Sequence, residues 1–190
     1  MYAVEDDPYC YPGTTVLRNR FDIRDEQVLE DLESELTTAR ADEPLPEGVL
    51  DETHFRAIHF HLFQDLYEWA GETRTVRLSK GTSHFCYPEH IDNQLATLFR
   101  GLNSDNHLRG LSCGEFATKV AAFLATLNVI HTFREGNGRA QLSFLLLLSE
   151  NAGHLLDLAQ MDPAAMLEAM IASFYGNEEP LTKILCDLIV

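Results

Sequence analysis

A Gly-Asn-Gly turn at 136–138 lies between two apolar helical segments, and this junction constrains the fold more than any other feature of the chain. Before the turn, apolar residues recur at steps of three and four, the spacing that places them on one face of a helix. They are Phe116, Val120, Phe123, Leu124, Leu127 and Ile130. After the turn comes an apolar run from Phe144 to Leu148. The pattern predicts two helices that meet at a corner, and it assigns the second run to the core.

Helical periodicity also dominates the rest of the chain. Ser112 and Glu115 have the spacing of a capping box, so the helix before the turn is expected to begin near residue 113. An earlier helical face is formed by Phe55, Ile58, His59, Leu62, Phe63 and Leu66. Weaker helices are expected at 28–36, 95–102 and 181–188, and another at 166–174, which Asp162 and Pro163 would open as cap and first-turn proline. The sequence therefore predicts a mainly helical, all-α fold.

One segment, at 73–88, departs from this rhythm. Residues 73–78 alternate and are rich in β-branched side chains, and an extended-looking piece at 84–87 stops at Pro88. This pattern predicts a small β-hairpin on the helical body. A chain of 190 residues without an internal repeat or a low-complexity linker is expected to form a single domain, 1–190.

Composition excludes several classes of function. The 30 Asp and Glu against 14 Lys and Arg give a formal net charge of −16, which disfavours nucleic acid and anionic membranes as partners. The four cysteines are scattered and form no CxxC pair, so structural zinc and a disulfide framework are not expected. The first residues are acidic and polar, unlike a signal peptide, and no apolar stretch approaches the roughly 20 residues that span a bilayer. A cytoplasmic, reducing setting is therefore expected.

The turn also carries the groups of a phosphate-binding site. The backbone N–H groups of the glycine turn can converge on an anion, and the positive end of the following helix dipole adds to the attraction. Arg139 can bind a phosphate, Glu135 can hold a Mg²⁺ that bridges phosphates, and His131 can accept a proton near neutral pH. Neither a Walker A motif nor a kinase motif set is present in the sequence. The reaction class favoured is transfer of a phosphate-containing group from a nucleotide to a hydroxyl.

The stretch from His131 to Arg139 resembles the Fic-domain signature H-x-F-x-[DE]-G-N-G-R-x-x-R. Residues 9–19 resemble the amino end of bacterial Fic proteins of the toxin and type IV secretion effector kind. Residues 63–72 are similar to the helix that leads into the hairpin, or flap, of these proteins, and residues 79–85 are similar to the flap itself. The resemblance covers nearly the whole chain.

This resemblance implies a Mg²⁺-dependent adenylyltransferase, which moves AMP from ATP to a Tyr, Thr or Ser hydroxyl of a target protein. His131 would be the catalytic base, Glu135 would hold Mg²⁺, and Phe133 would fix the loop in the core. Nucleotide binding would fall to Gly136, Asn137, Gly138 and Arg139, with Arg139 on the phosphate tail. The flap would pair with an extended target segment by strand addition. Its target-binding residues would be Lys80, Gly81, Thr82, Ser83 and Phe85.

The signature departs from the family at two positions. Thr132 replaces the usual proline, which affects only the stiffness of the loop. Leu142 replaces the second arginine, which in relatives binds the γ-phosphate and pairs with a glutamate of an inhibitory helix. The loss of one charged contact is worth roughly 1.5–3 kcal/mol, which weakens activity without abolishing it. A Fic-type transferase with another donor, such as phosphate or phosphocholine, and a catalytically silent interaction module remain alternatives.

The inhibitory motif [ST]-x-x-x-E-[GN] is absent from the sequence. The resemblance therefore implies a class that is restrained by a separate small antitoxin-like protein. The enzyme would act in the bacterial cytosol, or in the host cytosol if the protein is a secreted effector.

Overall fold

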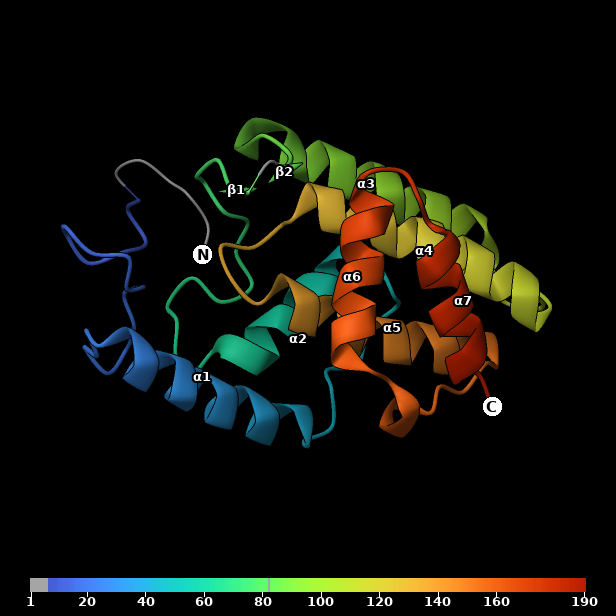
Figure 1. Ribbon diagram of the computed structural model, residues 1–190, viewed down its shortest axis with the longest axis horizontal. Helices are drawn as coiled ribbons and strands as arrows, with labels where there is room; N and C mark the ends of the chain where they lie inside the picture. The colour runs from blue at the N-terminus through green and yellow to red at the C-terminus, as the bar shows by residue number, and fades with distance from the viewer. Residues whose placement is uncertain (1–6, 82) are drawn as a thin grey trace.

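The computed structural model describes residues 7–81 and 83–190, which form a helical body that carries a small two-stranded hairpin (Figure 1). The helices are α1 (Glu26–Ala41), α2 (Glu52–Phe63), α3 (Pro88–Ser104), η1 (Asn106–Leu108), α4 (Cys113–Ile130), α5 (Asn137–Ala152), η2 (Leu158–Gln160), α6 (Pro163–Phe174) and α7 (Glu179–Leu188). Strands β1 (Ser79–Lys80) and β2 (Ser83–His84) pair antiparallel. This architecture confirms the predicted fold class, mainly helical with a small β-hairpin.

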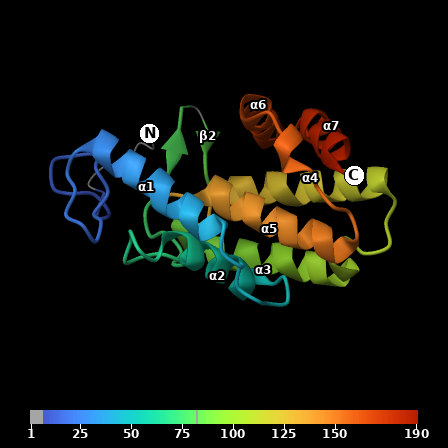
Figure 2. The same cartoon turned by 90° about the horizontal axis from the view of Figure 1, so that it is seen from below.

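Helix α4 lies in the middle of the molecule, with α3 and α5 beside it and α6 and α7 stacked on one side (Figure 2). Helices α1 and α2 pack on each other, and α2 packs on α5. By length and mean hydropathy (1.3 over 18 residues) α4 is the one described helix that could cross a membrane, and half of it is buried inside the fold. Its central position accounts for its apolar composition.

Short-range caps begin the helices where the sequence places them. The Asp25 carboxylate accepts the Val28 N–H at 3.0 Å, and Asp162 accepts the Ala164 N–H at 2.9 Å ahead of Pro163. Glu115 accepts the Ser112 N–H at 3.0 Å, so α4 begins at residue 113 as predicted. The expected helices at 28–36, 95–102, 166–174 and 181–188 all lie within observed ones.

The end of α2 differs from the prediction. Leu66 was expected on the helical face, but α2 ends at Phe63 and Leu66 lies in the following turn. The Phe63 carbonyl accepts the N–H groups of both Leu66 and Tyr67 at 3.0 Å, which tightens the chain into that turn. Leu66 is nevertheless buried, so the apolar pattern correctly predicts its burial and not its conformation.

The hairpin is much smaller than the predicted 73–88. Among the described residues, Ser79 pairs with His84 and Lys80 with Ser83, and the Leu78 carbonyl accepts the Phe85 N–H at 3.2 Å. Residues 73–77 and 86–87 lie outside this ladder. The physical reason is the buried side chain of Arg74. Its guanidinium donates hydrogen bonds to the Val76 and Cys86 carbonyl oxygens, both at 2.6 Å. These carbonyls are therefore unavailable to a strand ladder, and a side chain replaces the pairing that the alternating pattern predicts.

An aromatic cluster at the centre of the core ties the functional loop to the helices. Phe133 packs on Phe55 with ring centroids 5.2 Å apart, and Phe55 meets Phe144 edge to face at 5.8 Å. Phe99 contacts Phe144 at 5.3 Å in the same way. Phe133 has no exposed surface, as expected for the residue that fixes the loop.

Candidate functional site

His131 ends helix α4 in a left-handed backbone conformation (φ 51°), and its N–H donates to the Leu127 carbonyl at 3.0 Å. Its side chain is buried and stacks on the Phe85 ring with centroids 3.8 Å apart. Nδ1 lies 3.2 Å from the Asn128 carbonyl oxygen, which can only accept, so Nδ1 carries the proton of the neutral ring. The proton-accepting nitrogen is then Nε2.

Burial lowers the pKa of His131 to about 3, with smaller contributions from the positive charges of Arg74 and Lys80. The hydrogen bond to Asn128 acts in the opposite direction but is outweighed. The imidazole is consequently neutral at pH 7, the protonation state that a base requires.

The turn after His131 is closed by one side chain. Asn137 Oδ1 accepts the Phe133 N–H at 2.9 Å, and Asn137 Nδ2 donates to the Phe133 carbonyl at 2.8 Å. Gly136 adopts φ 76°, and a Cβ at this position would lie 2.1 Å from Cζ of Phe63. The turn therefore needs glycine at 136 for two reasons, its backbone conformation and the close approach of an aromatic ring.

Helix α5 begins at Asn137, and the first N–H groups of a helix have no acceptor within it. Gly138 is exposed at this helix start, and, apart from its chain neighbours and its own helix backbone, no described atom lies within 4 Å of where its Cβ would be. The Glu135 carboxylate lies beside the same point and accepts the Gly136 N–H at 2.9 Å. Burial raises the pKa of Glu135. The start of α5, where Gly138 carries no side chain, thus lies beside the Glu135 carboxylate.

Arg139 turns toward helix α1. It forms an ion pair with Glu33, donates to Thr37 Oγ1 at 3.0 Å, and lies over the Phe63 ring at 4.7 Å. Tyr67 donates its hydroxyl to the same Glu33 carboxylate. These two polar contacts use two of the five N–H groups of the guanidinium, which leaves three donors to be directed elsewhere.

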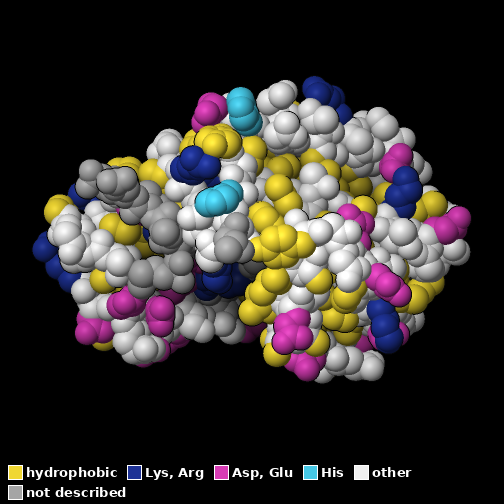
Figure 3. Space-filling view, turned by 45° about the horizontal axis from the view of Figure 1, so that its top comes forward, with side chains coloured by type: hydrophobic (Ala, Val, Ile, Leu, Met, Phe, Trp, Pro, Cys, Tyr) yellow, Lys and Arg dark blue, Asp and Glu magenta, His cyan; other side chains and the backbone are white. Residues whose placement is uncertain are grey.

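Two cavities flank the loop. The larger, of about 680 Å³, is mainly apolar and carries His131, Gly138 and Leu142 on its wall. Its apolar wall comes mostly from α6, over which hydrophobic side chains gather near the centre of the face in Figure 3. The smaller cavity, of about 370 Å³, is lined by charged groups that include Glu33 and Glu135. Leu142 therefore contributes to the apolar cavity on the His131 side.

The flap residues take different positions. Lys80 lines both cavities, whereas Gly81 and Ser83 line only the larger one. The Ser83 hydroxyl lies 3.0 Å from the Tyr175 hydroxyl, which connects the flap to the end of α6. Phe85 is buried between His131 and Phe174, so its ring faces the site. Thr82 lies outside the described residues.

Two residues that support the loop were not predicted from the sequence. Arg74, only 1% exposed, donates through Nε to the His131 carbonyl at 2.7 Å and through Nη2 to the Ile130 carbonyl at 3.3 Å. His59 Nδ1 accepts the Gly71 N–H at 2.8 Å, so Nε2 donates to the Glu135 carbonyl at 3.0 Å. His59 also stacks on Phe133, with centroids 3.7 Å apart, which explains its burial without a metal.

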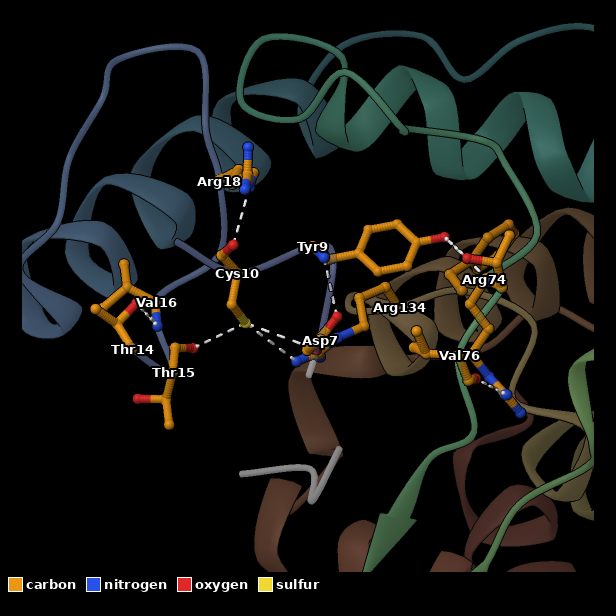
Figure 4. Close-up of polar contacts among 12 residues, drawn as sticks. Asp7, Tyr9, Cys10, Thr14, Thr15, Val16, Arg18, Arg74, Val76 and Arg134 are labelled. Carbon is orange, nitrogen blue, oxygen red and sulfur yellow. Dashed lines mark hydrogen bonds and ion pairs between the residues drawn. The ribbon is translucent and has the colours of Figure 1, made fainter. Parts of the chain in front are cut away.

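The N-terminal segment also buttresses the loop (Figure 4). Arg134 donates through Nε to the Asp7 carboxylate at 2.7 Å, and both side chains are less than a tenth exposed. Tyr9 accepts the Thr75 N–H at 3.1 Å ahead of the flap. Arg134 is a variable position of the signature, so the motif alone offers no signal for this contact.

Comparisons with known proteins identify the family of this chain. The model of the Fic/DOC family matches residues 49–149. The "Probable protein adenylyltransferase y4lH" of Sinorhizobium fredii is 49% identical over 181 residues, which cover 95% of this chain and 94% of that protein. The protein adenylyltransferase VbhT of Bartonella schoenbuchensis is 35% identical over 97% of this chain, which spans 39% of VbhT.

Solved structures show the same fold. The BepC protein of Bartonella tribocorum, a VirB-translocated effector crystallised with AMPPNP, superposes with a TM-score of 0.85 at 32% identity and covers 96% of both chains. The helical architecture, the loop between α4 and α5, and the matched family model lead to the same assignment. The chain belongs to the Fic/DOC family.

Proposed function

We propose that the chain is a protein adenylyltransferase that transfers AMP from ATP to a Tyr, Thr or Ser hydroxyl of a target protein. The observation that carries the proposal is the neutral His131, held by Asn128 at the edge of a 680 Å³ cavity beside the open start of α5. Relatives over most of this chain are named protein adenylyltransferases, and BepC holds the ATP analogue AMPPNP. The nucleoside would occupy the apolar cavity, with its α-phosphate next to His131.

His131 would act as the general base of the transfer. Nε2 takes the proton of the target hydroxyl as its oxygen attacks the α-phosphorus, and the bond from that phosphorus to the leaving pyrophosphate breaks. The low pKa keeps the base unprotonated at neutral pH, and the hydrogen bond from Nδ1 to Asn128 fixes the ring for proton uptake.

The phosphates would bind at the start of α5. The N–H groups of Asn137, Gly138 and Arg139 lack helical acceptors, and the helix dipole attracts negative charge to the same point. The bare Gly138 leaves room for a phosphate oxygen to approach these groups. The donors of Arg139 not used by Glu33 and Thr37 would reach the phosphate tail.

Glu135 would contribute the protein ligand of a Mg²⁺ ion. In the described part of the chain no group of three or more His, Cys, Asp or Glu could hold a metal, so the ion would depend on phosphate oxygens for its other ligands. The carboxylate oxygen chemistry fits such a shared site. When bound, Mg²⁺ neutralises charge on the polyphosphate.

Target recognition is assigned to the flap. An extended target segment would pair with the short hairpin at Lys80, Gly81 and Ser83, and the predicted role of Thr82 belongs to the same surface. Phe85, which stacks on His131, would set the position of the base.

A separate antitoxin-like inhibitor and a cytoplasmic site of action remain predictions. The prediction of one domain, 1–190, is supported by the single cluster that buried apolar residues from Cys10 to Leu185 form.

The proposal is tested by incubating the full chain with ATP labelled in the adenine and a lysate from its natural setting. One or a few proteins should become labelled, and His131→Ala should abolish the signal. The variant His90→Ala, which removes an exposed histidine, should label normally. Labelling that survives His131→Ala would contradict the mechanism. Mass spectrometry of the product distinguishes an AMP adduct from a phosphate or phosphocholine adduct.

A further inference from the structure

Helix α7 packs against α4 and α6 through a buried apolar face. Leu181, Leu185 and Leu188 are buried on this face. The segment after the helix is held by a bridge between Leu156 and Ile189. Because α6 lines the large cavity and packs on α7, the attachment of α7 to α4 supports one wall of the site.

Two cysteines meet at the α4–α7 contact. The Sγ atoms of Cys113, the first residue of α4, and Cys186, on α7, are 3.7 Å apart. Cys113 is half-buried and Cys186 is exposed, so small molecules in solvent can reach the pair. The other two cysteines have different surroundings. Cys10 is buried, and the Cys86 Sγ lies 3.5 Å from the Tyr87 carbonyl oxygen.

The distance between the two thiols is suited to bond formation. A disulfide needs sulfur atoms about 2 Å apart, and rotations about the two Cα–Cβ bonds can shorten a gap of this size. Lys183, one turn before Cys186, has a raised pKa, mainly from its hydrogen bond to Asp187, with a contribution from the nearby Cys186. A neighbouring ammonium group favours the thiolate that exchange chemistry requires.

We propose that Cys113 and Cys186 form a reversible thiol–disulfide site that reacts with small disulfides of the general form R–S–S–R. The Cys186 thiolate attacks one sulfur, which breaks the R–S–S–R bond, forms a mixed disulfide and releases one thiolate RS⁻. Cys113 then loses its proton to solvent and attacks the Cys186 sulfur, which expels the second RS⁻. Two protein thiols are oxidised to one disulfide, and R–S–S–R is reduced to two RSH.

The product would connect α4 covalently to α7 across a sequence separation of 73 residues. A cross-link over a loop of this length restricts the unfolded chain strongly, so the oxidised protein should melt roughly 5–10 °C higher than the reduced one. The disulfide would also hold α7, the helix that supports α6, in place. The site would therefore couple the redox state of its surroundings to the rigidity of the α6 wall of the large cavity.

The test uses the full chain and 2-hydroxyethyl disulfide, an uncharged reagent that the strongly acidic protein does not repel. Peptide mapping without reductant should find a Cys113–Cys186 link, and the rise in Tm should disappear with dithiothreitol. Cys86→Ser, the matched control, should behave like the parent. Cys113→Ser should keep the hydroxyethylthio group on Cys186 and show no rise in Tm.

Two results would overturn the proposal: a parent protein that carries the reagent on Cys186 without a link to Cys113, or one whose two thiols do not react. The readouts need neither nucleotide nor target protein. Failure of this site is therefore distinguishable from failure of the proposed transferase activity.

Discussion

Arg139 and Glu33 form an ion pair that connects the start of α5 to α1, so the arginine of the glycine turn shares its charge with a carboxylate of the same chain. Replacement of Glu33 by Gln removes a negative charge beside the predicted phosphate site and leaves Arg139 in place. We expect Glu33→Gln to raise the affinity for ATP by about three- to ten-fold, the equivalent of one charged contact of roughly 1 kcal/mol. Calorimetric titration measures this change.

The matched control is Glu30→Gln, which removes the same charge from α1 at an exposed position that lines the smaller cavity. It should change the affinity less than Glu33→Gln does. A fall in affinity with Glu33→Gln would show instead that the carboxylate positions Arg139 for the nucleotide.

Leu142 is the second position at which charge can be tested. It lines the large cavity together with Gly138, so an arginine there would add a cation on the His131 side of the loop. We expect Leu142→Arg to increase nucleotide affinity or transfer rate roughly ten-fold or more, since a charged hydrogen bond is worth about 1.5–3 kcal/mol. Leu142→Gln, polar and uncharged, separates the effect of charge from that of shape. Equal behaviour of the two variants would place Leu142 away from the triphosphate.

The glycine turn offers a comparison of stability with binding. In Gly136→Ala the new methyl group would meet Phe63 at 2.1 Å from a left-handed backbone, so we expect a loss of about 2–4 kcal/mol in the free energy of unfolding. Gly138→Ala meets no atom within 4 Å and should fold with parental stability. Its methyl group should weaken nucleotide binding instead. Urea denaturation and calorimetry distinguish the two, and equal stability of both variants would contradict the steric argument.

The buried Arg74 leads to a prediction about the position of the base. Arg74→Met leaves the carbonyls of Val76, Cys86, Ile130 and His131 without their guanidinium donor. We expect a loss of about 3–5 kcal/mol in unfolding free energy by urea denaturation. Arg74→Lys keeps the charge but cannot reach all four carbonyls, so it should fold and transfer AMP at least ten-fold more slowly, with a lower kcat. A lysine variant with parental kcat would limit Arg74 to a structural role.

Two buried histidines make stability dependent on pH. Burial lowers the pKa of both His59 and His131 to about 3, whereas an unfolded histidine titrates near 6.5. Below pH 6.5 these two histidines bind more protons in the unfolded chain than in the folded one. Their contribution to the free energy of unfolding is therefore full above pH 6.5 and is lost as the pH falls. We expect the free energy of unfolding to fall by about 1.4 kcal/mol per pH unit for each histidine between pH 6.5 and 5.

Glu135 acts in the opposite direction. Because its pKa is raised in the folded state, its protonation stabilises the folded chain as the pH falls and offsets part of the loss in unfolding free energy. Urea denaturation at pH 7, 6 and 5 measures the slope. His131→Phe keeps a ring against Phe85 and should reduce the slope by about half, while an unchanged slope would show that His131 does not contribute.

The parts of this structure that were predictable depend on neighbours in the chain. Asp162 and Pro163 cap a helix through contacts of two or three residues, and the glycine turn carries its chemistry within a few positions. The supports of the loop depend on distant partners. Arg74 lies 57 residues from His131, and His59 lies 76 residues from Glu135. Neither contact can therefore be predicted from local periodicity or from the motif.

The hairpin is shorter than the sequence pattern predicts for the same reason. The alternating, β-branched pattern of 73–78 favours a strand locally, but the Arg74 guanidinium competes for the carbonyls at 76 and 86. Likewise, the cysteines give no sign in the sequence that Cys113 and Cys186 would meet. Pairings across the fold decide these features, and they become visible only when the helices are packed.

The buried pair of Asp7 and Arg134 has a consequence for where this protein can be trimmed. The family match covers 49–149, yet the residue beside Glu135 in the signature is neutralised from position 7. A protein cut back to the matched span would lose the Asp7 carboxylate that pairs with the buried Arg134 side chain, and breaking a buried ion pair costs about 3–5 kcal/mol. A fragment limited to the matched span is therefore expected to be less stable than one that also includes Asp7.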